Sequence, residues 1–191
     1  MVTKTDSDGK EKELYAPVKS ALELLFKPFG VGLIAVTSKR IPDEIKERLD
    51  KDSLFYAKSV RLIPDIMGYL WSSRKNDPPI FIRPGLIVAE VKHGPLRLWD
   101  IYQTKMYSEL FNSQIAFLIS DTRILVELRR FLDEHQYMLH THEGSHPLYI
   151  GVLANPRAPV SWYSISWYPY DPFALSSAMR AKRNAPDPAE T

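Results

Sequence analysis

The chain has 191 residues, of which 45% are hydrophobic and 25% charged, and its formal net charge at pH 7 is +2. These values are typical of a globular protein with one substantial core and exclude a disordered or fibrous chain. So small a net charge neither requires nor excludes a polyanionic partner, because local patches rather than total charge bind phosphates. The absence of Cys excludes disulfides, thiol nucleophiles, iron–sulfur clusters and all-thiolate zinc sites.

The sequence predicts neither an export signal nor a membrane span. Its longest apolar runs, at 31–36, 86–91 and 115–119, have the length of strands. They fall far short of the roughly 20 residues that cross a bilayer. We therefore expect a cytoplasmic protein without membrane association.

The first part of the chain predicts a polar arm, a helix and a strand. Residues 1–12 are polar and of mixed charge, and we expect them to form a flexible arm. From residue 13 onward, apolar residues recur at helical spacing. Because proline is tolerated in the first turn of a helix, Pro17 places the start of this helix within 13–16. The apolar run at 31–36 predicts a strand.

The remaining elements alternate between helix and strand. Residues 41–49 predict a short helix, and extended segments at 54–70 and 80–91, joined by a polar turn, favour an antiparallel hairpin. The second half predicts a helix, a strand, a helix and two short edge strands, at 96–111, 114–120, 123–135, 137–141 and 148–154. This order predicts an α/β fold in which a mixed central β-sheet is flanked by helices.

One domain is expected over residues 13–155, followed by a C-terminal extension. The extension, residues 156–183, is rich in aromatic residues and is expected to pack on the domain or at an interface. Its densest part, residues 162–170, is also suited to stacking on nucleobases. Residues 184–191 are expected to form a disordered tail.

Three charged residues stand in apolar segments of the predicted hairpin. The run 86–91 is apolar except for Glu90, and Lys92 follows it. Because side chains alternate along a strand, Glu90 and Lys92 project from the same face. Asp65 lies in the apolar segment of the preceding strand and, if the two strands pair, can approach Glu90. Two carboxylates that meet in this way repel each other unless a cation lies between them.

These residues resemble the signature of a known superfamily. Pro64-Asp65, a hairpin, and an apolar strand ending in Glu90-Val91-Lys92 are similar to the motif of the PD-(D/E)XK nucleases. The resemblance implies a restriction-endonuclease-like fold for the domain at 13–155, and it extends over roughly 13–120.

Two further features fit the RecB-like members of that superfamily. Gln103 and Tyr107 match the Gln-x-x-x-Tyr motif that follows the catalytic lysine in those members. Such members often carry an acidic residue in the first helix, and Glu13 is the best-placed residue here, although Glu11 and Glu23 are also acidic. The related group that adds an iron–sulfur cluster is excluded by the absence of Cys.

The resemblance implies a Mg²⁺-dependent nuclease that hydrolyses phosphodiester bonds, with DNA as the expected substrate and Mn²⁺ as a substitute metal. Asp65, Glu90 and the main-chain carbonyl of Val91 would bind the metal through hard oxygen ligands. Lys92 would position the attacking water and stabilise negative charge on the phosphoryl group. Glu13 would complete the acidic cluster, directly or through a metal-bound water. Gln103 and Tyr107 would contact the substrate backbone or hold the lysine.

The resemblance leaves the partners open. A homodimer is compatible with cutting both strands of a duplex, and any helicase partner would be a separate chain. The alternative function is an inactive nucleic-acid-binding or structural subunit with the same fold.

Each site residue also has a structural interpretation. Glu90 and Lys92 could form an ion pair at a strand end, and Gln103 and Tyr107 could be ordinary helix-surface residues. Glu13 could be a solvated glutamate that favours the helix dipole. A zinc site is a weaker alternative to a polar loop for four clustered histidines, His135, His140, His142 and His146. His93, which follows Lys92, has no assigned role.

Overall fold

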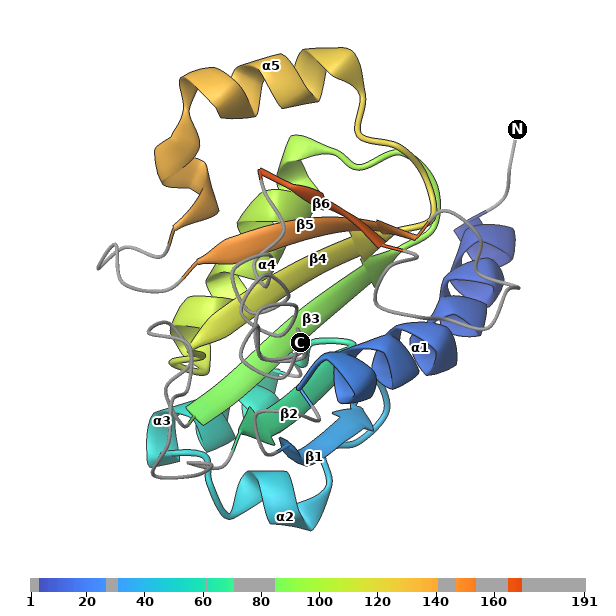
Figure 1. Ribbon diagram of the computed structural model, residues 1–191. Coiled ribbons are helices and arrows are strands. Elements are labelled where there is room, and N and C mark those ends of the chain that lie inside the picture. Colours follow the sequence, from blue (N-terminus) through green and yellow to red (C-terminus); the bar gives the residue numbers. More distant parts are fainter. Residues whose placement is uncertain are drawn as a thin grey trace, which may run out of the picture.

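The computed structural model describes residues 4–26, 31–60, 62–70, 85–140, 147–153 and 165–169, which form an α/β fold around one mixed sheet (Figure 1). The six strands follow one another across the sheet in chain order. They are β1 (Val31–Val36), β2 (Ile66–Leu70), β3 (Gly85–Lys92), β4 (Ile115–Ser120), β5 (Leu148–Leu153) and β6 (Ile165–Tyr168). The predicted fold class, a mixed sheet flanked by helices, is confirmed.

The sheet changes from antiparallel to parallel at β3. Antiparallel pairing joins β1 to β2 and β2 to β3, so the predicted hairpin is confirmed. Parallel pairing joins β3 to β4 and β4 to β5, and β6 returns antiparallel to β5. Both β3 and β4 are apolar and buried on both faces, as expected of central strands.

Helices cover both faces of this sheet. The helical elements are α1 (Lys4–Phe26), α2 (Asp43–Lys46), α3 (Lys51–Phe55), the π-helical turn η2 (Tyr56–Val60), α4 (Leu98–Leu110), α5 (Val126–Glu134) and the 3₁₀ turn η3 (Gln136–Leu139). In Figure 1, α1 crosses in front of the sheet and α4 lies behind it. Within the described ranges, no helix combines the length and apolar character needed to cross a membrane.

The two faces of the sheet belong to separate cores. Ile87 of β3 packs with Phe26 and Phe117 in the core beneath α1, where the two phenylalanine ring centroids are 6.0 Å apart. Val88, the next residue, packs with Phe111 in the core beneath α4. Because side chains alternate along a strand, β3 supplies both cores at once. This burial fixes the position of β3 relative to both helices.

The expected start of the first helix is wrong. The structure begins α1 at Lys4 rather than within 13–16, so Pro17 lies inside the helix and residues 4–12 are helical. A proline inside a helix removes one backbone hydrogen bond and costs about 3 kcal/mol. The burial of Leu14, Val18 and Leu22 against the sheet offsets that cost.

Two expected strands are also wrong in part. Residues 54–60 of the predicted extended segment are helical, in α3 and η2, and this helical stretch begins where the Asp50 side chain accepts a hydrogen bond of 2.7 Å from the Ser53 N–H. Such an N-cap satisfies a backbone donor that the helix leaves free. Residues 137–139 lie in η3 rather than in a strand. The predicted edge strand at 148–154 is β5, which has neighbours on both sides because β6 pairs with it.

The strand β6 comes from the aromatic-rich extension at 156–183. Gly151 of β5 lies opposite Trp167 of β6, and the Trp167 ring packs against Phe117 of β4 at a centroid distance of 5.5 Å. This part of the extension therefore completes the same sheet. The remainder of the extension and the expected tail at 184–191 lie outside the described residues.

Candidate active site

Asp65 directly precedes β2, and its backbone is hydrogen-bonded to Thr37, the residue that follows β1. The Thr37 N–H donates to the carbonyl oxygen of Asp65 at 2.8 Å, and the Thr37 hydroxyl donates to the carbonyl oxygen of Pro64 at 2.6 Å. Backbone pairing with β3 begins only at the next residue, Ile66. At Asp65 the side chain rather than the backbone bonds to β3, because its Oδ2 accepts a hydrogen bond of 2.9 Å from the Val91 N–H.

A tyrosine of α1 fixes the other oxygen of Asp65. The Tyr15 hydroxyl donates to Oδ1 of Asp65 at 2.7 Å, and this bond is buried. Burial raises the pKa of Asp65, although the hydrogen bonds from Tyr15 and Val91 and the charge of Lys92 oppose that rise. Burial and the hydrogen bond to Asp65 raise the pKa of Tyr15 far above its usual range, so the phenol remains a donor.

Glu90 and Lys92 project from the same face of β3, as their spacing predicts. The Lys92 Nζ donates to Oε1 of Glu90 at 2.7 Å. The Glu90 residue is only 3% exposed, and its Oε2 is buried without a hydrogen-bond partner in the part of the chain that the structure describes. Such an atom loses its hydration with nothing in return, which costs about 1–3 kcal/mol.

The charges of these groups influence one another. Burial and the neighbouring Asp65 carboxylate raise the pKa of Glu90 to about 8, although Lys92 opposes the rise. Burial alone would lower the pKa of Lys92, but the Glu90 carboxylate, together with Glu11 and Asp65, outweighs burial and raises that pKa. The lysine therefore keeps its charge at neutral pH, while the Asp65 carboxylate destabilises the ionised form of Glu90.

The acidic residue that α1 brings to this site is Glu11 rather than Glu13. Oε2 of Glu11 lies 4.0 Å from the Lys92 Nζ, and Oε1 accepts a hydrogen bond of 3.4 Å from the Tyr15 hydroxyl. Glu13 is exposed. Residues four apart share a helix face, whereas residues two apart point in nearly opposite directions. The error follows from the misplaced helix start, which left residue 11 outside the helix.

Gln103 and Tyr107 lie on α4, beside the carboxylates. The Gln103 Nε2 donates to the Tyr107 hydroxyl at 3.2 Å, and Tyr107 is buried in the core beneath α4. Burial raises the pKa of Tyr107, and the negative charges of Glu90 and Asp65 add to that effect. Among the described residues, no hydrogen bond joins this pair to Lys92, whose ammonium is held by Glu90.

The sequence patterns did not predict a second polar group at the same edge of the sheet, which is centred on Asp121. Oδ2 of Asp121 lies 2.5 Å from the Nδ1 of His93, and its Oδ1 accepts hydrogen bonds from the Gly94 N–H at 2.9 Å and the Thr122 hydroxyl at 3.0 Å. Lys92 pairs in register with Ser120, so the residues that follow these parallel strands meet. Asp121 could have been found from this rule, since it directly follows an apolar strand.

The donor set of the site suits a hard divalent cation. Mg²⁺ binds oxygen ligands and commonly uses only one or two carboxylates, with waters and substrate phosphates completing its shell. The carboxylates of Asp65 and Glu90 supply these oxygens, and the unpartnered Oε2 of Glu90 is the atom that such an ion would satisfy. In the described ranges, no group of three or more His, Asp or Glu side chains is arranged to hold a metal.

The histidine cluster gives no support to a zinc site. His142 and His146 lie outside the described residues. Nδ1 of His135 lies 2.9 Å from the Phe131 carbonyl oxygen, and its ring stacks on the Phe131 ring at 4.3 Å. His140 forms an isolated bridge with Pro147.

Comparison of the chain with models of protein families, with curated proteins and with solved structures found no match in any of the three. The site is therefore characterised by its own chemistry. Two buried carboxyl groups with raised pKa values meet a charged lysine at the end of a central strand. Ionisable groups perturbed in this way are typical of functional sites.

Proposed function

We propose that the protein is a Mg²⁺-dependent nuclease of the PD-(D/E)XK type, with a restriction-endonuclease-like fold, that hydrolyses phosphodiester bonds in DNA. One observation carries the proposal: Oε2 of Glu90 is buried and unpartnered beside Asp65 and Lys92. An ion pair that served only structure would leave that oxygen bonded or exposed, because an unmet buried acceptor is costly. A bound cation would satisfy the oxygen and relieve the repulsion between the carboxylates.

The residues that would hold the cation are Asp65, Glu90 and, through its main-chain carbonyl, Val91. Glu11, rather than Glu13, would add a further negative charge beside Lys92 and Tyr15, outside the group that holds the cation. Once bound, Mg²⁺ supplies a Lewis acid that polarises a phosphate oxygen and activates water. Tyr15 keeps the Asp65 carboxylate oriented through its hydrogen bond of 2.7 Å.

Lys92 supplies the fixed positive charge of the proposed site. Its ammonium is held 2.7 Å from Oε1 of Glu90 and remains protonated at neutral pH. A partly buried cation in this position stabilises negative charge that develops on a phosphoryl group, at little cost in reorganisation. The Gln103–Tyr107 pair, which shares one face of α4, is suited to contact with the substrate backbone.

Cleavage assays test this proposal. The substrates are linear, circular, branched and single-stranded DNA, each incubated with Mg²⁺, with Mn²⁺ and with EDTA. We expect cleavage that requires the metal and is lost in Asp65→Asn and Lys92→Met. Glu13→Gln is the matched control, because this exposed glutamate lies on the same helix as Glu11. Equal cleavage by Asp65→Asn and parent preparations would show that the activity comes from a contaminant.

A second candidate is an inactive DNA-binding subunit with the same fold. It is favoured by the absence, among the described residues, of a third acidic side chain arranged with Asp65 and Glu90 to hold a metal. Calorimetric titration with Mn²⁺ separates the two functions. Binding that is lost in Asp65→Asn supports the nuclease, whereas DNA binding without Mn²⁺ binding or cleavage supports the inactive subunit.

A further inference from the structure

The first two turns of α4 present aromatic residues to solvent. Trp99 is 72% exposed and Tyr102 is 47% exposed. The solvent side of a surface helix usually carries charged or polar residues, so a tryptophan and a tyrosine three residues apart are unusual there. In contrast, Ile101 and Thr104 of the same turns are fully buried against the sheet. The exposed pair therefore contributes little to the core.

This aromatic pair lies at the start of the helix that follows the last residue of the proposed active site on β3. Residues 93–97 connect Lys92, the last residue of β3, to the start of α4. Trp99 and Tyr102 are the second and fifth residues of that helix, which rises about 1.5 Å per residue. Gln103 lies four residues after Trp99 and donates its hydrogen bond to Tyr107. Because residues four apart share a helix face, Trp99 lies on the face that carries the Gln103–Tyr107 pair.

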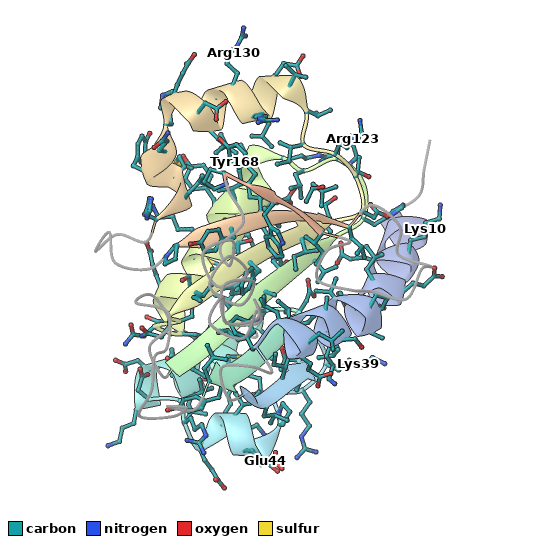
Figure 2. All side chains as sticks on the ribbon, in the orientation of Figure 1. Lys10, Lys39, Glu44, Arg123, Arg130 and Tyr168 are labelled. Atoms are coloured by element: carbon teal, nitrogen blue, oxygen red, sulfur yellow. The ribbon has the colours of Figure 1, made fainter. Side chains whose placement is uncertain are left out.

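Positive charge gathers at the same edge of the sheet. Lys10 precedes Glu11 on α1, Lys39 follows the end of β1, and Arg123 follows the end of β4. Figure 2 shows these three side chains on the side of the molecule toward which β3 and β4 point. All three are exposed, and none forms an ion pair within the described part of the chain. They are therefore available to phosphates.

We propose that Trp99 and Tyr102 form a stacking platform for unpaired bases of a single-stranded nucleic acid, whose phosphates contact Lys10, Lys39 and Arg123. This inference rests on the proposed function, because it specifies single-stranded nucleic acid as the substrate of the proposed nuclease site. Exposed aromatic rings bind bases of any sequence through their faces, and basic side chains follow the backbone. A duplex keeps its base faces stacked inside, so it cannot use this platform.

Binding measured without metal tests the platform separately from cleavage. The probe is a fluorescein-labelled oligothymidylate of about twelve nucleotides, within the range that one single-strand site covers. Its anisotropy is titrated in EDTA with parent protein, Trp99→Ala, Trp99→Phe and Tyr102→Ala. The matched control is Phe55→Ala, because Phe55 is 59% exposed on α3, and α3 contacts the far end of α4 through the Ser53–Leu110 hydrogen bond.

We expect Trp99→Ala to weaken oligothymidylate binding by about tenfold and Trp99→Phe by less, while Phe55→Ala has no effect. A matched duplex should bind more weakly than the single strand and be insensitive to Trp99→Ala. Equal losses for Trp99→Ala and Phe55→Ala would overturn the platform. The platform would also be overturned if Trp99→Ala bound oligothymidylate with unchanged affinity but lost a dimer that light scattering detects in the parent. That result would assign this face to contact with a second copy of the chain.

The two proposals fail in different ways. If Trp99→Ala loses binding but the parent never cleaves DNA with Mg²⁺, the platform stands and the nuclease is rejected. If the parent cleaves DNA and Trp99→Ala binds oligothymidylate normally, the nuclease stands and the platform is rejected. Thermal melting of Trp99→Ala should match the parent because the ring is mostly exposed, and Tyr102→Ala provides an independent reading of the same face.

Discussion

Two polar groups lie side by side at one edge of the sheet, and they differ in how well their charges are met. In the acidic cluster, formed by Asp65, Glu90 and Lys92, one carboxylate oxygen is buried without a partner among the described residues. In the Asp121 cluster, formed by Asp121 with His93, Gly94 and Thr122, both carboxylate oxygens have partners.

The pKa values of the carboxyl groups follow this difference. Burial and the negative charge of Asp65 raise the pKa of Glu90 to about 8. Burial would also raise the pKa of Asp121, but hydrogen bonds from Gly94, His93 and Thr122 outweigh it and hold that pKa below its usual range. Satisfied carboxylates stabilise a fold, whereas unsatisfied ones are retained where a ligand or a reaction needs them. This difference is why we propose the acidic cluster, and not the Asp121 cluster, as the functional member of the pair.

The largest expected difference between the clusters is catalytic. Asp65→Asn should lower the rate of Mg²⁺-dependent DNA cleavage by about 10³-fold, because it removes a charged ligand from the proposed metal site. Asp121→Asn should lower that rate by less than about tenfold. Single-turnover cleavage of one DNA substrate measures both. Equal losses in the two variants would show that the Asp121 cluster belongs to the catalytic machinery.

A smaller effect is expected from the hydrogen bond that orients Asp65. Tyr15→Phe should weaken Mn²⁺ binding by about 10- to 100-fold, because groups that orient a metal ligand have effects of this size. Tyr168→Phe is the matched control, since the Tyr168 hydroxyl also donates to an aspartate, Asp133, at 2.7 Å. Calorimetric titration should show unchanged Mn²⁺ affinity in that control. Equal weakening of Mn²⁺ binding in both variants would show that the loss does not come from the hydrogen bond to Asp65.

The stability of the metal-free protein should depend on pH through Glu90. Its pKa is about 8 in the folded chain against 4.5 in the unfolded chain, so the unfolded state releases the proton first as pH rises. Stability is therefore lost between these two pH values. At pH 8 in EDTA, Glu90→Gln should unfold at a temperature about 4–8 °C higher than the parent, which corresponds to about 2 kcal/mol.

The Asp121 cluster should respond with the opposite sign. The pKa of Asp121 is lowered in the folded state, so its contribution is present at neutral pH and is lost as pH falls below 3.8. Asp121→Asn should therefore destabilise the protein at pH 8. Thermal melting followed by circular dichroism at pH 5 and pH 8 measures both variants. A melting temperature of Glu90→Gln below that of the parent at pH 8 would contradict the electrostatic difference between the clusters.

The smallest expected effect distinguishes two glutamates of α1. Glu11→Gln should slow cleavage by about fivefold, because Glu11 lies 4.0 Å from the charged Lys92 and its charge acts on the site from that distance. Glu13→Gln should have no effect, because Glu13 is exposed. Initial cleavage rates at limiting Mg²⁺ compare the two variants. A loss in Glu13→Gln alone would restore the residue that the sequence motif favours.

The sequence predicts most of the sheet because burial leaves a local pattern. The runs that form β1 and β4 are apolar on both faces, and their bounds agree with the structure within one residue. The shared direction of Glu90 and Lys92 follows from strand alternation alone. Their hydrogen bond confirms that prediction.

Other parts of the site depend on contacts between distant residues. The Tyr15–Asp65 hydrogen bond joins residues 50 apart, and no local pattern specifies it. Glu13 was preferred to Glu11 because the usual position of proline in a helix was applied to Pro17, whereas packing against the sheet overrides that preference. Asp121 meets His93 only because β3 and β4 run parallel in one register.

Pro17 divides α1 into two segments with different energetic ties to the protein. A proline has no N–H, so the Glu13 carbonyl loses its partner within the helix and the ladder of hydrogen bonds is interrupted there. The segment before the interruption carries Glu11 and Tyr15, and the segment after it carries the fully buried Leu22 and Phe26. Backbone hydrogen bonds therefore tie the first segment to the second less tightly at this point, and the first segment is held by its own contacts, the burial of Leu14 and the Tyr15–Asp65 hydrogen bond.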